Sequence, residues 1–304
     1  MPTPFDPILA ERGTVVLDGG MGTELDRRGL DLRDPLWSAR VLVEAPDAIR
    51  DVHTAYFDAG ADVAISASYQ ASFEGLAARG FGPSEAGALF RRSVELAREA
   101  AGATGSRLVA ASIGPYGAFL GNGAEYTGDY DLGEAELIAF HAPRLEALAE
   151  AAPDLFAVET IPSIEETTAL LIALERVPEL PAWISFSCRD GAHLCDGTAF
   201  ERAVETAVSS PSVVAVGVNC TSPLHVGSLV EIASRLTDRP VVCYPNRGAF
   251  WDPVRKVWVD PPRQDARPAL RPLDWRDAGA RLIGGCCGTT PDDIASIASA
   301  LRPA

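Results

Sequence analysis

The sequence predicts an α/β protein in which eight parallel strands and eight helices form one (β/α)8 TIM barrel. Short apolar or β-branched runs alternate with longer stretches of helical spacing along the chain. The strands are continuous apolar runs, as expected where both faces of a parallel sheet are covered. A length of 304 residues is long for an ordinary domain but usual for such a barrel. We therefore expect one domain over residues 1–304.

The predicted strands are short segments rich in Val, Ile and Ala. They are residues 14–20, 61–69, 107–114, 154–161, 181–188, 212–220, 240–246 and 280–287. The first clear helix covers 47–60, where Ile49, Val52 and Tyr56 share one face. The helix over 83–102 begins with Pro and Ser and ends before Gly. Further helices are predicted at 134–150, 163–176, 199–208, 222–236, 273–279 and 291–301.

An open, doubly wound sheet is the alternative arrangement for this alternation of strands and helices. That fold usually carries a G-x-G-x-x-G turn after its first strand. Here the turn reads DGGMGTEL, which lacks that spacing. The closed barrel is therefore favoured, and a dinucleotide site is not expected.

Composition and charge exclude several classes of partner. Hydrophobic residues make up 47% and charged residues 22%, and the net charge is -16 with a single lysine, Lys256. Such a surface should repel nucleic acid and anionic membranes. The first residues show no secretory pattern, and no apolar run approaches the ~18 residues of a membrane span. We expect a cytoplasmic monomer or homodimer that acts on small molecules.

Two connections are long for a barrel, 115–133 and 247–272. Both follow the carboxyl ends of strands, where barrel active sites lie. Both are rich in Gly and aromatic residues. They are candidates for a lid or a substrate wall, with surface decoration as the alternative.

The six cysteines divide into two groups. Cys188, Cys195 and Cys243 are expected to be free core or loop thiols. By contrast, Cys220 ends the sixth strand, and Cys286 and Cys287 end the eighth. All three should face the same mouth of the barrel.

Three thiolates with an open fourth position are typical of a catalytic zinc site. The surrounding glycines of GGCCG would let the two neighbouring sulfurs of Cys286 and Cys287 converge, because glycine reaches backbone angles that other residues avoid. An inert or redox-active pair and a vicinal disulfide are the alternatives. A third thiol, Cys220, at a nearby strand end favours a Zn²⁺ site over these alternatives. The Zn²⁺ would activate an entering thiol as a nucleophile.

Several motifs resemble the homocysteine S-methyltransferase family. They include LDGGMGTEL near the start, GVNC at the sixth strand and GGCCGTTP at the eighth. The resemblance runs from end to end. SASYQAS (66–72), SIGPYGAFLGNGAEYTGDY (112–130), ETIPS (159–163), SFSCRDGAHLCDGT (185–198) and YPNRG (244–248) are similar to the branch that uses S-methylmethionine or S-adenosylmethionine.

The resemblance implies a barrel that holds zinc through Cys220, Cys286 and Cys287 and transfers a methyl group to homocysteine, giving methionine. Asp18 can accept hydrogen bonds from the substrate ammonium, and Glu159 is a second ammonium partner, as in the family. Backbone N–H groups can hold the substrate carboxylate. Those groups belong to Gly19, Gly20 and Met21. Asn219 could orient the zinc ligands or bind substrate.

A sulfonium donor is a cation, and aromatic faces suit it. Candidate donor contacts are Trp37, Tyr116, Tyr126, Tyr130 and Phe250, with Gln70 as a polar wall. His53 lies on an apolar helical face and is interpreted as a core histidine.

Other functions remain open on the sequence. A betaine-dependent enzyme, or one that methylates selenocysteine or another thiol, would share the zinc ligands. A non-catalytic zinc- or thiol-binding barrel is a further alternative. A phosphate-binding barrel would use the glycines after the eighth strand. Schiff-base chemistry is disfavoured because Lys256 is the only lysine.

Overall fold

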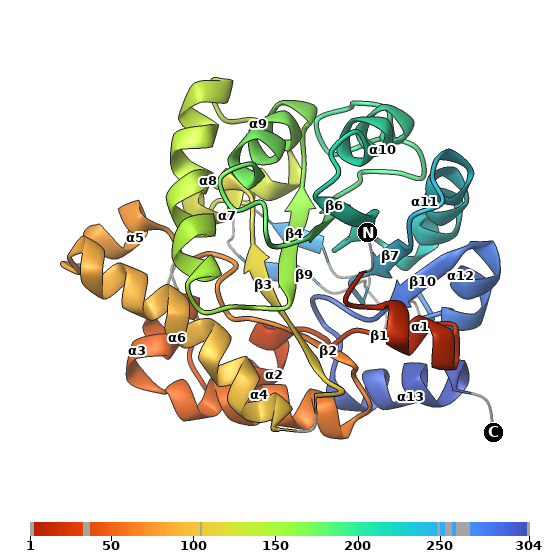
Figure 1. The fold of residues 1–304 in the computed structure, drawn as a ribbon, viewed down its shortest axis with the longest axis horizontal. Helices are drawn as coiled ribbons and strands as arrows, with labels where there is room; N and C mark the ends of the chain where they lie inside the picture. The colour runs from red at the N-terminus through yellow and green to blue at the C-terminus, as the bar shows by residue number, and fades with distance from the viewer. Residues whose placement is uncertain are drawn as a thin grey trace.

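Eight parallel strands form a closed barrel surrounded by helices in the computed structural model (Figure 1). The structure describes residues 3–32, 37–103, 105–247, 250–252, 257–259 and 268–302. The strand order is β1-β10-β7-β6-β5-β4-β3-β2. Leu17, just after β1, bridges to Val63 of β2 in parallel, and this bridge closes the ring. The fold class predicted from the sequence is therefore confirmed.

Each barrel strand falls within a segment that the sequence predicted. The strands are β1 (Val15–Val16), β2 (Val63–Ile65), β3 (Leu108–Ile113), β4 (Leu155–Ile161), β5 (Ala182–Phe186), β6 (Val213–Asn219), β7 (Val241–Tyr244) and β10 (Ala280–Ile283). They are shorter than predicted because the last residues of most segments leave the hydrogen-bonded ladder. Those residues form the mouth of the barrel.

The eight predicted helices form the outer layer. They are α4 (Pro46–Asp58), α6 (Pro83–Ala101), α8 (Glu134–Ala149), α9 (Ile164–Leu174), α10 (Phe200–Val208), α11 (Pro223–Leu236), α12 (Pro272–Ala278) and α13 (Pro291–Leu301). The start of α6 illustrates how the sequence sets a boundary. The N–H of Gly82 donates to the Glu85 carboxylate at 2.8 Å, and Pro83 occupies the first turn, where no N–H is needed.

Several short elements were not predicted. They are α1 (Asp6–Arg12), α2 (Met21–Arg27), α3 (Trp37–Glu44), α5 (Phe73–Ala77), α7 (Tyr116–Leu120), the 3₁₀ turn η1 (Ala124–Tyr126) and the antiparallel pair β8 (Phe250–Asp252) and β9 (Val257–Val259). The segment 115–133 therefore contains two short helical elements, α7 and η1. Elements this short carry too few residues to show a helical period.

The core has two layers, one inside the barrel and one between strands and helices. The inner layer includes Phe5 of the N-terminal segment, whose ring centre lies 6.3 Å from that of Trp183. Since α1 leads directly into β1, Phe5 fills the barrel at its N-terminal end. Figure 1 shows α1 to the right of the central strands, near β1 and β10. The opposite end, where the strands terminate, is left for the functional site.

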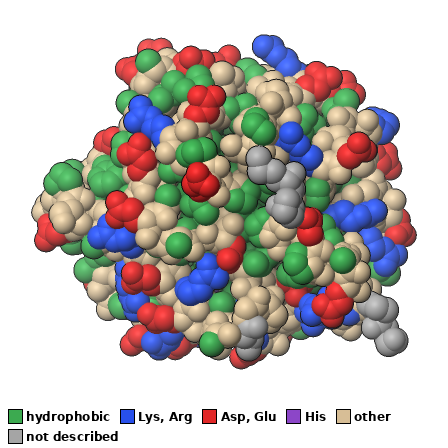
Figure 2. Space-filling model, in the orientation of Figure 1, with side chains coloured by type: hydrophobic (Ala, Val, Ile, Leu, Met, Phe, Trp, Pro, Cys, Tyr) green, Lys and Arg blue, Asp and Glu red, His purple; other side chains and the backbone are tan. Residues whose placement is uncertain are grey.

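The described helices include none that is long and apolar enough to cross a membrane. Figure 2 shows acidic and basic side chains interspersed over the face viewed. The net charge of -16 is therefore not gathered into one continuous acidic patch on that face.

Candidate metal centre and active site

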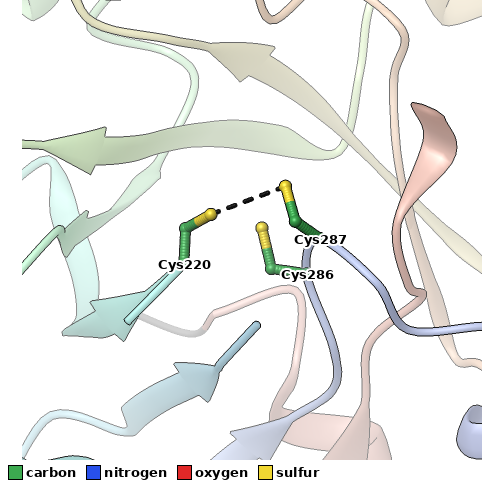
Figure 3. A group of neighbouring side chains, drawn as sticks. All are labelled: Cys220, Cys286 and Cys287. Atoms are coloured by element: carbon green, nitrogen blue, oxygen red, sulfur yellow. Dashed lines mark hydrogen bonds between the residues drawn. The ribbon is translucent and has the colours of Figure 1, made fainter. Parts of the chain in front are cut away.

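Three cysteine sulfurs converge at the mouth of the barrel. The Sγ atoms of Cys220, Cys286 and Cys287 all lie within 4.8 Å of one another, and those of Cys220 and Cys287 are 3.6 Å apart (Figure 3). Among the described residues, this is the one group of three or more Cys, His, Asp or Glu side chains placed to hold a metal ion. The site combines the end of β6 with the turn after β10, as the sequence predicted.

Cys220 reaches the centre through an unusual backbone conformation. Its φ angle is 47°, in the left-handed region that non-glycine residues rarely adopt. Its N–H donates to the carbonyl of Tyr244 at 3.1 Å, and its own carbonyl accepts from Asn246 Nδ2 at 3.2 Å. Hydrogen bonds on both sides of the residue therefore hold the strained turn.

The glycines of GGCCG act differently from the prediction. Gly284 and Gly285 do not adopt positive φ; in this motif only Gly288 does, at 79°. A Cβ on Gly284 would lie 2.6 Å from Leu17 Cβ, and one on Gly285 would lie 2.4 Å from Thr289 Oγ1. Their role is close packing against the first strand end and the following turn. Of the three glycines predicted to let the sulfurs converge, Gly288 has the expected left-handed backbone, whereas Gly284 and Gly285 allow close packing.

The three thiols share protons unequally. The thiols of Cys286 and Cys287 hydrogen-bond to Cys220, and these bonds lower the pKa of Cys220 well below its usual range. The same bonds raise the pKa values of Cys286 and Cys287, and burial raises them further. The tyrosine hydroxyl of Tyr126 lies 3.2 Å from Cys220 Sγ and also lowers the pKa of Cys220.

Two buried carboxylates lie beside the sulfurs. Asp18 Oδ2 accepts from the Ile65 N–H at 2.8 Å, and burial followed by the charge of Glu159 raises the pKa of Asp18. Glu159 accepts hydrogen bonds from Ser112 Oγ and, at 3.0 Å, from the Tyr244 hydroxyl. Burial raises the pKa of Glu159 to about 7. Both acids stand at strand ends, as predicted, and could accept further hydrogen bonds from a cation.

The glycine turn after β1 supports only part of the predicted carboxylate cradle. The N–H of Gly20 donates to Thr289 Oγ1 at 3.1 Å and is already engaged. Gly20 would have to exchange this hydrogen bond to bind a substrate carboxylate as predicted. Gly19 lies against the Tyr56 ring, and Met21 begins α2, where a helix N-terminus presents free N–H groups. Gly19 and Met21 stay candidates.

Asn219 has a structural task. Its side-chain oxygen accepts from the Thr160 N–H at 2.7 Å and from Ser185 Oγ at 2.9 Å, and its nitrogen donates to Thr160 Oγ1 at 2.7 Å. These bonds hold Thr160, which has a φ of 63°, beside Glu159. Asn219 thus orients the strand ends and has little capacity left for substrate.

Gln70, unlike Asn219, has a side-chain acceptor without a hydrogen-bond partner among the described residues. Its Oε1 atom is buried and receives no hydrogen bond from the described part of the chain. A buried acceptor without a donor is costly unless something else supplies one. Gln70 therefore stays a candidate wall for substrate.

The aromatic candidates divide in the structure. Tyr116 packs edge-on against Phe140 at 4.9 Å and against Tyr130 at 5.4 Å. The Tyr130 hydroxyl donates to Glu166. These two rings serve packing around α7 and α8, whereas Tyr126 faces the sulfurs. Trp37 and Phe250 belong to α3 and β8, but their side chains lie outside the described set.

The remaining predicted core residues behave as expected. Cys188 and Cys243 are buried free thiols, and Cys195 is a half-buried one. His53 is fully buried, and burial lowers its pKa from 6.5 to about 3. Neither ring nitrogen has a hydrogen-bond partner among the described residues. It is a neutral core residue away from the chemistry.

Sequence reasoning missed four side chains around the centre. Tyr244 and Ser112 hold Glu159, and Tyr69 is close enough to Cys220 and Glu125 that their charges raise its pKa. Glu125 itself was also missed. YPNRG and the segment 112–130 contain Tyr244, Ser112 and Glu125, but a lone Tyr, Ser or Glu carries no spacing that would single it out.

A (β/α)8 barrel with three convergent thiols and two buried acids at its mouth offers the donor set of a metal site and the position of a barrel active site. Residues 15–301 match the family model of homocysteine S-methyltransferase. The chain is 45% identical to a homocysteine S-methyltransferase of Bacillus subtilis, covering 98% of each protein. The chain therefore belongs to the homocysteine S-methyltransferase family.

Two further relatives bear on the site. The metallated form of a homocysteine methyltransferase from Escherichia coli superposes with a TM-score of 0.86 at 42% identity, covering 98% of this chain and all of that one. A selenocysteine Se-methyltransferase of Brassica oleracea is 41% identical and covers 94% of this chain and 88% of its own. The resemblance predicted from the sequence motifs is confirmed.

Proposed function

We propose that this chain transfers a methyl group from a sulfonium donor, S-methylmethionine or S-adenosylmethionine, to the thiol of L-homocysteine, giving methionine. The observation that carries the proposal is the convergence of Cys220, Cys286 and Cys287 within 4.8 Å. Family membership supports the same reaction. We also propose that residues 1–304 act as one homocysteine-binding domain.

The metal proposed for the three thiols is zinc. Three sulfur donors with room for one more fit the chemistry of a catalytic zinc site, and thiolates disfavour hard cations such as Mg²⁺. The lowered pKa of Cys220 supports a site ready to lose protons to a metal. When bound, zinc would lower the pKa of a coordinating thiol and so supply a thiolate at neutral pH.

The chain's own groups would bind and orient homocysteine. Asp18 and Glu159 are proposed to hold the ammonium group. Both are buried acids, and they lie close enough that the charge of Glu159 raises the pKa of Asp18. The N–H groups of Gly19 and Met21 are proposed to hold the carboxylate. Gln70, with its unpartnered Oε1, would accept a hydrogen bond from one of the two substrates.

Walls around the sulfurs would exclude water and align the two substrates. The Tyr126 hydroxyl contacts Cys220 Sγ, and the Tyr244 hydroxyl donates a hydrogen bond to Glu159. Holding the donor methyl in line with the acceptor sulfur accounts for much of the rate in such transfers. No general base is required once the acceptor is a thiolate.

The alternatives to this proposal differ in the acceptor or in the donor. The Brassica oleracea relative bears a selenocysteine-methylating name, so another thiol or a selenol is an alternative acceptor. Betaine is an alternative donor, and a non-catalytic zinc- or thiol-binding barrel is the remaining alternative. We further propose a cytoplasmic protein, monomeric or homodimeric, that acts on small molecules without nucleic acid or membrane partners.

A donor panel tests the proposal. Methionine formation from homocysteine should be measured with S-methylmethionine, S-adenosylmethionine, betaine and methylfolate in turn. One of the two sulfonium donors should support turnover. Methionine from betaine or methylfolate alone, or from no donor, would contradict the proposal.

A cysteine substitution tests the metal. Cys286→Ser should lose bound zinc and reduce methyl transfer by at least ~10³-fold, since a ligand of the catalytic metal is removed. The control is Cys243→Ala, which removes a buried thiol of β7 outside the sulfur group. It should keep both zinc and activity. Unchanged activity in Cys286→Ser would reject the metal site.

A further inference from the structure

Glu125 carries a carboxylate in which one oxygen, Oε2, has no hydrogen-bond partner among the described residues. It lies in η1, within the long segment between β3 and α8. Its Oε2 atom is shielded from solvent and receives no hydrogen bond from any described residue. No ion pair with Glu125 is found in the described part of the chain. An ionised carboxylate buried without a counter-charge is costly, and a cation bound beside it would offset that cost.

The backbone of Glu125 is fixed in place. Ser187 Oγ, at the end of β5, donates to the Glu125 carbonyl at 2.9 Å. On the other side, α7 passes so close that a Cβ on Gly117 would lie 2.4 Å from the Glu125 nitrogen. The next residue, Tyr126, reaches Cys220 Sγ at 3.2 Å. The carboxylate is therefore built into the wall of the site.

The surroundings of this carboxylate are those of the metal centre. The neighbouring residue Tyr126 lies against Cys220 Sγ, and the charge of Cys220 is among the causes that raise the pKa of Glu125. Burial is the larger cause, and it brings the pKa of Glu125 to about 7. A cation placed beside Glu125 would thus lie next to the sulfurs and would favour the ionised carboxylate.

Glu125 is separate from the acids proposed for homocysteine. Asp18 follows β1, and Glu159 lies in β4 two residues before its end; both already accept hydrogen bonds from the protein. Glu125 comes from the segment after β3 and has none at Oε2. The proposed reaction brings two cations to the site, the ammonium of the acceptor and the onium centre of the donor.

We propose that Glu125 is the counter-ion of the donor's sulfonium centre and selects a positively charged methyl donor. This inference rests on the proposed methyl transfer. During transfer, a bond forms between the acceptor sulfur and the methyl carbon. The bond from that carbon to the donor sulfur breaks, and its electron pair stays on the donor sulfur. The donor therefore loses its positive charge and leaves as a neutral thioether.

This charge change defines the expected kinetic signature. The attraction to Glu125 is strongest before transfer and weakens as the sulfonium is neutralised. Such an interaction favours the bound ground state, so it lowers the KM for the donor without raising kcat. It also helps release the neutral thioether product. Glu125 is accordingly a residue of donor recognition, and its loss should leave the chemical step intact.

The test compares Glu125→Gln with wild type in the zinc-loaded enzyme. With S-methylmethionine, the KM for the donor should rise by about 10- to 100-fold, the range for losing a charged partner. The kcat and the KM for homocysteine should stay within about threefold, which is small beside the donor effect. The control is Asp129→Asn, an exposed carboxylate of the same segment. It should match wild type in every parameter.

A second probe identifies which positive charge Glu125 meets. Trimethylsulfonium has a sulfonium centre but no ammonium, so it should inhibit wild type competitively with the donor. Its inhibition constant should rise in Glu125→Gln in parallel with the donor KM. An unchanged inhibition constant would overturn the sulfonium assignment in favour of the donor's ammonium. A selective rise in the homocysteine KM would overturn it in favour of the acceptor.

Two remaining outcomes are also decisive. If Glu125→Gln loses zinc or unfolds at a lower temperature, the residue supports the metal centre and the proposal fails. If it retains wild-type donor kinetics, Glu125 has no role in donor recognition. Absence of methionine with wild type itself would instead reject the proposed function, so the two failures are distinguishable.

Discussion

Cys220, a proposed metal ligand, has a φ angle of 47°. The sequence could place a thiol at the end of the sixth strand, because the strand pattern and the position of the cysteine are both visible. It could not reveal the left-handed turn, which depends on hydrogen bonds from residues of β7 and the turn after it. The convergence of Cys220 with Cys287 is thus a tertiary property.

His53 gives a residue-scale prediction on stability. Its pKa falls from 6.5 to about 3 because the folded protein buries the neutral ring. Between those pH values His53 is protonated in the unfolded chain but neutral in the folded one. Acidification therefore lowers the free energy of unfolding by ~1.4 kcal/mol per pH unit. Relative to His53→Leu, wild type should lose about 2 kcal/mol of unfolding free energy between pH 7 and pH 5.

Urea unfolding of both proteins at several pH values measures this difference. The control is His225→Gln, a half-buried histidine of α11. Its unfolding free energy should follow wild type across the same range. If wild type and His53→Leu also keep a constant difference, the buried histidine is not neutral in the way described.

At the scale of elements, buried bonds fasten the segment 115–133. Glu166 of α9 accepts from the Tyr116 N–H at 2.6 Å, from His141 Nε2 at 2.8 Å and from the Tyr130 hydroxyl. All of these groups are inside the protein or partly so. The segment is therefore held as a wall of the site, which favours the wall over surface decoration.

The substitution Gly117→Ala tests whether this wall depends on the close packing of α7 against η1. An Ala side chain there would meet the backbone of η1, 2.4 Å from the Glu125 nitrogen. Gly117→Ala should displace η1, cost about 1–3 kcal/mol of unfolding free energy through overpacking, and reduce methyl transfer by at least about tenfold. Thermal unfolding and initial rates measure both effects.

Gly227 in α11 offers the matched control. It also lies in a helix, but a Cβ there would meet no heavy atom within 4 Å. Gly227→Ala should stabilise the protein by up to ~1 kcal/mol and leave activity unchanged, because Ala favours a helix over Gly. Equal effects of the two substitutions would show that close packing on η1 is unimportant.

At the scale of the whole molecule, the barrel was predictable from the sequence, but the way its N-terminal end is filled was not. The alternation of strands and helices predicted the barrel and every one of its strands. It missed α1, whose seven residues show too little periodicity, and therefore missed how Phe5 fills the N-terminal end.

The site was predictable to the extent that its residues follow strands. Cys220, Cys286, Asp18 and Glu159 all stand at strand ends, where topology alone brings them together. Glu125 does not, and only folding of the segment after β3 puts its carboxylate beside the sulfurs. Tyr116 comes from the same segment, and its ring contact with Phe140 leaves its predicted role as a donor contact open.

The central claim is that one metal held by three thiols makes methyl transfer possible. The most direct measurement is a zinc titration of metal-free, reduced protein, with bound zinc and methionine formation followed together. We predict that activity rises linearly and reaches a plateau at about one zinc per chain, the content of a single three-thiolate site. Full activity without zinc, or activity that does not follow bound zinc, would contradict the account.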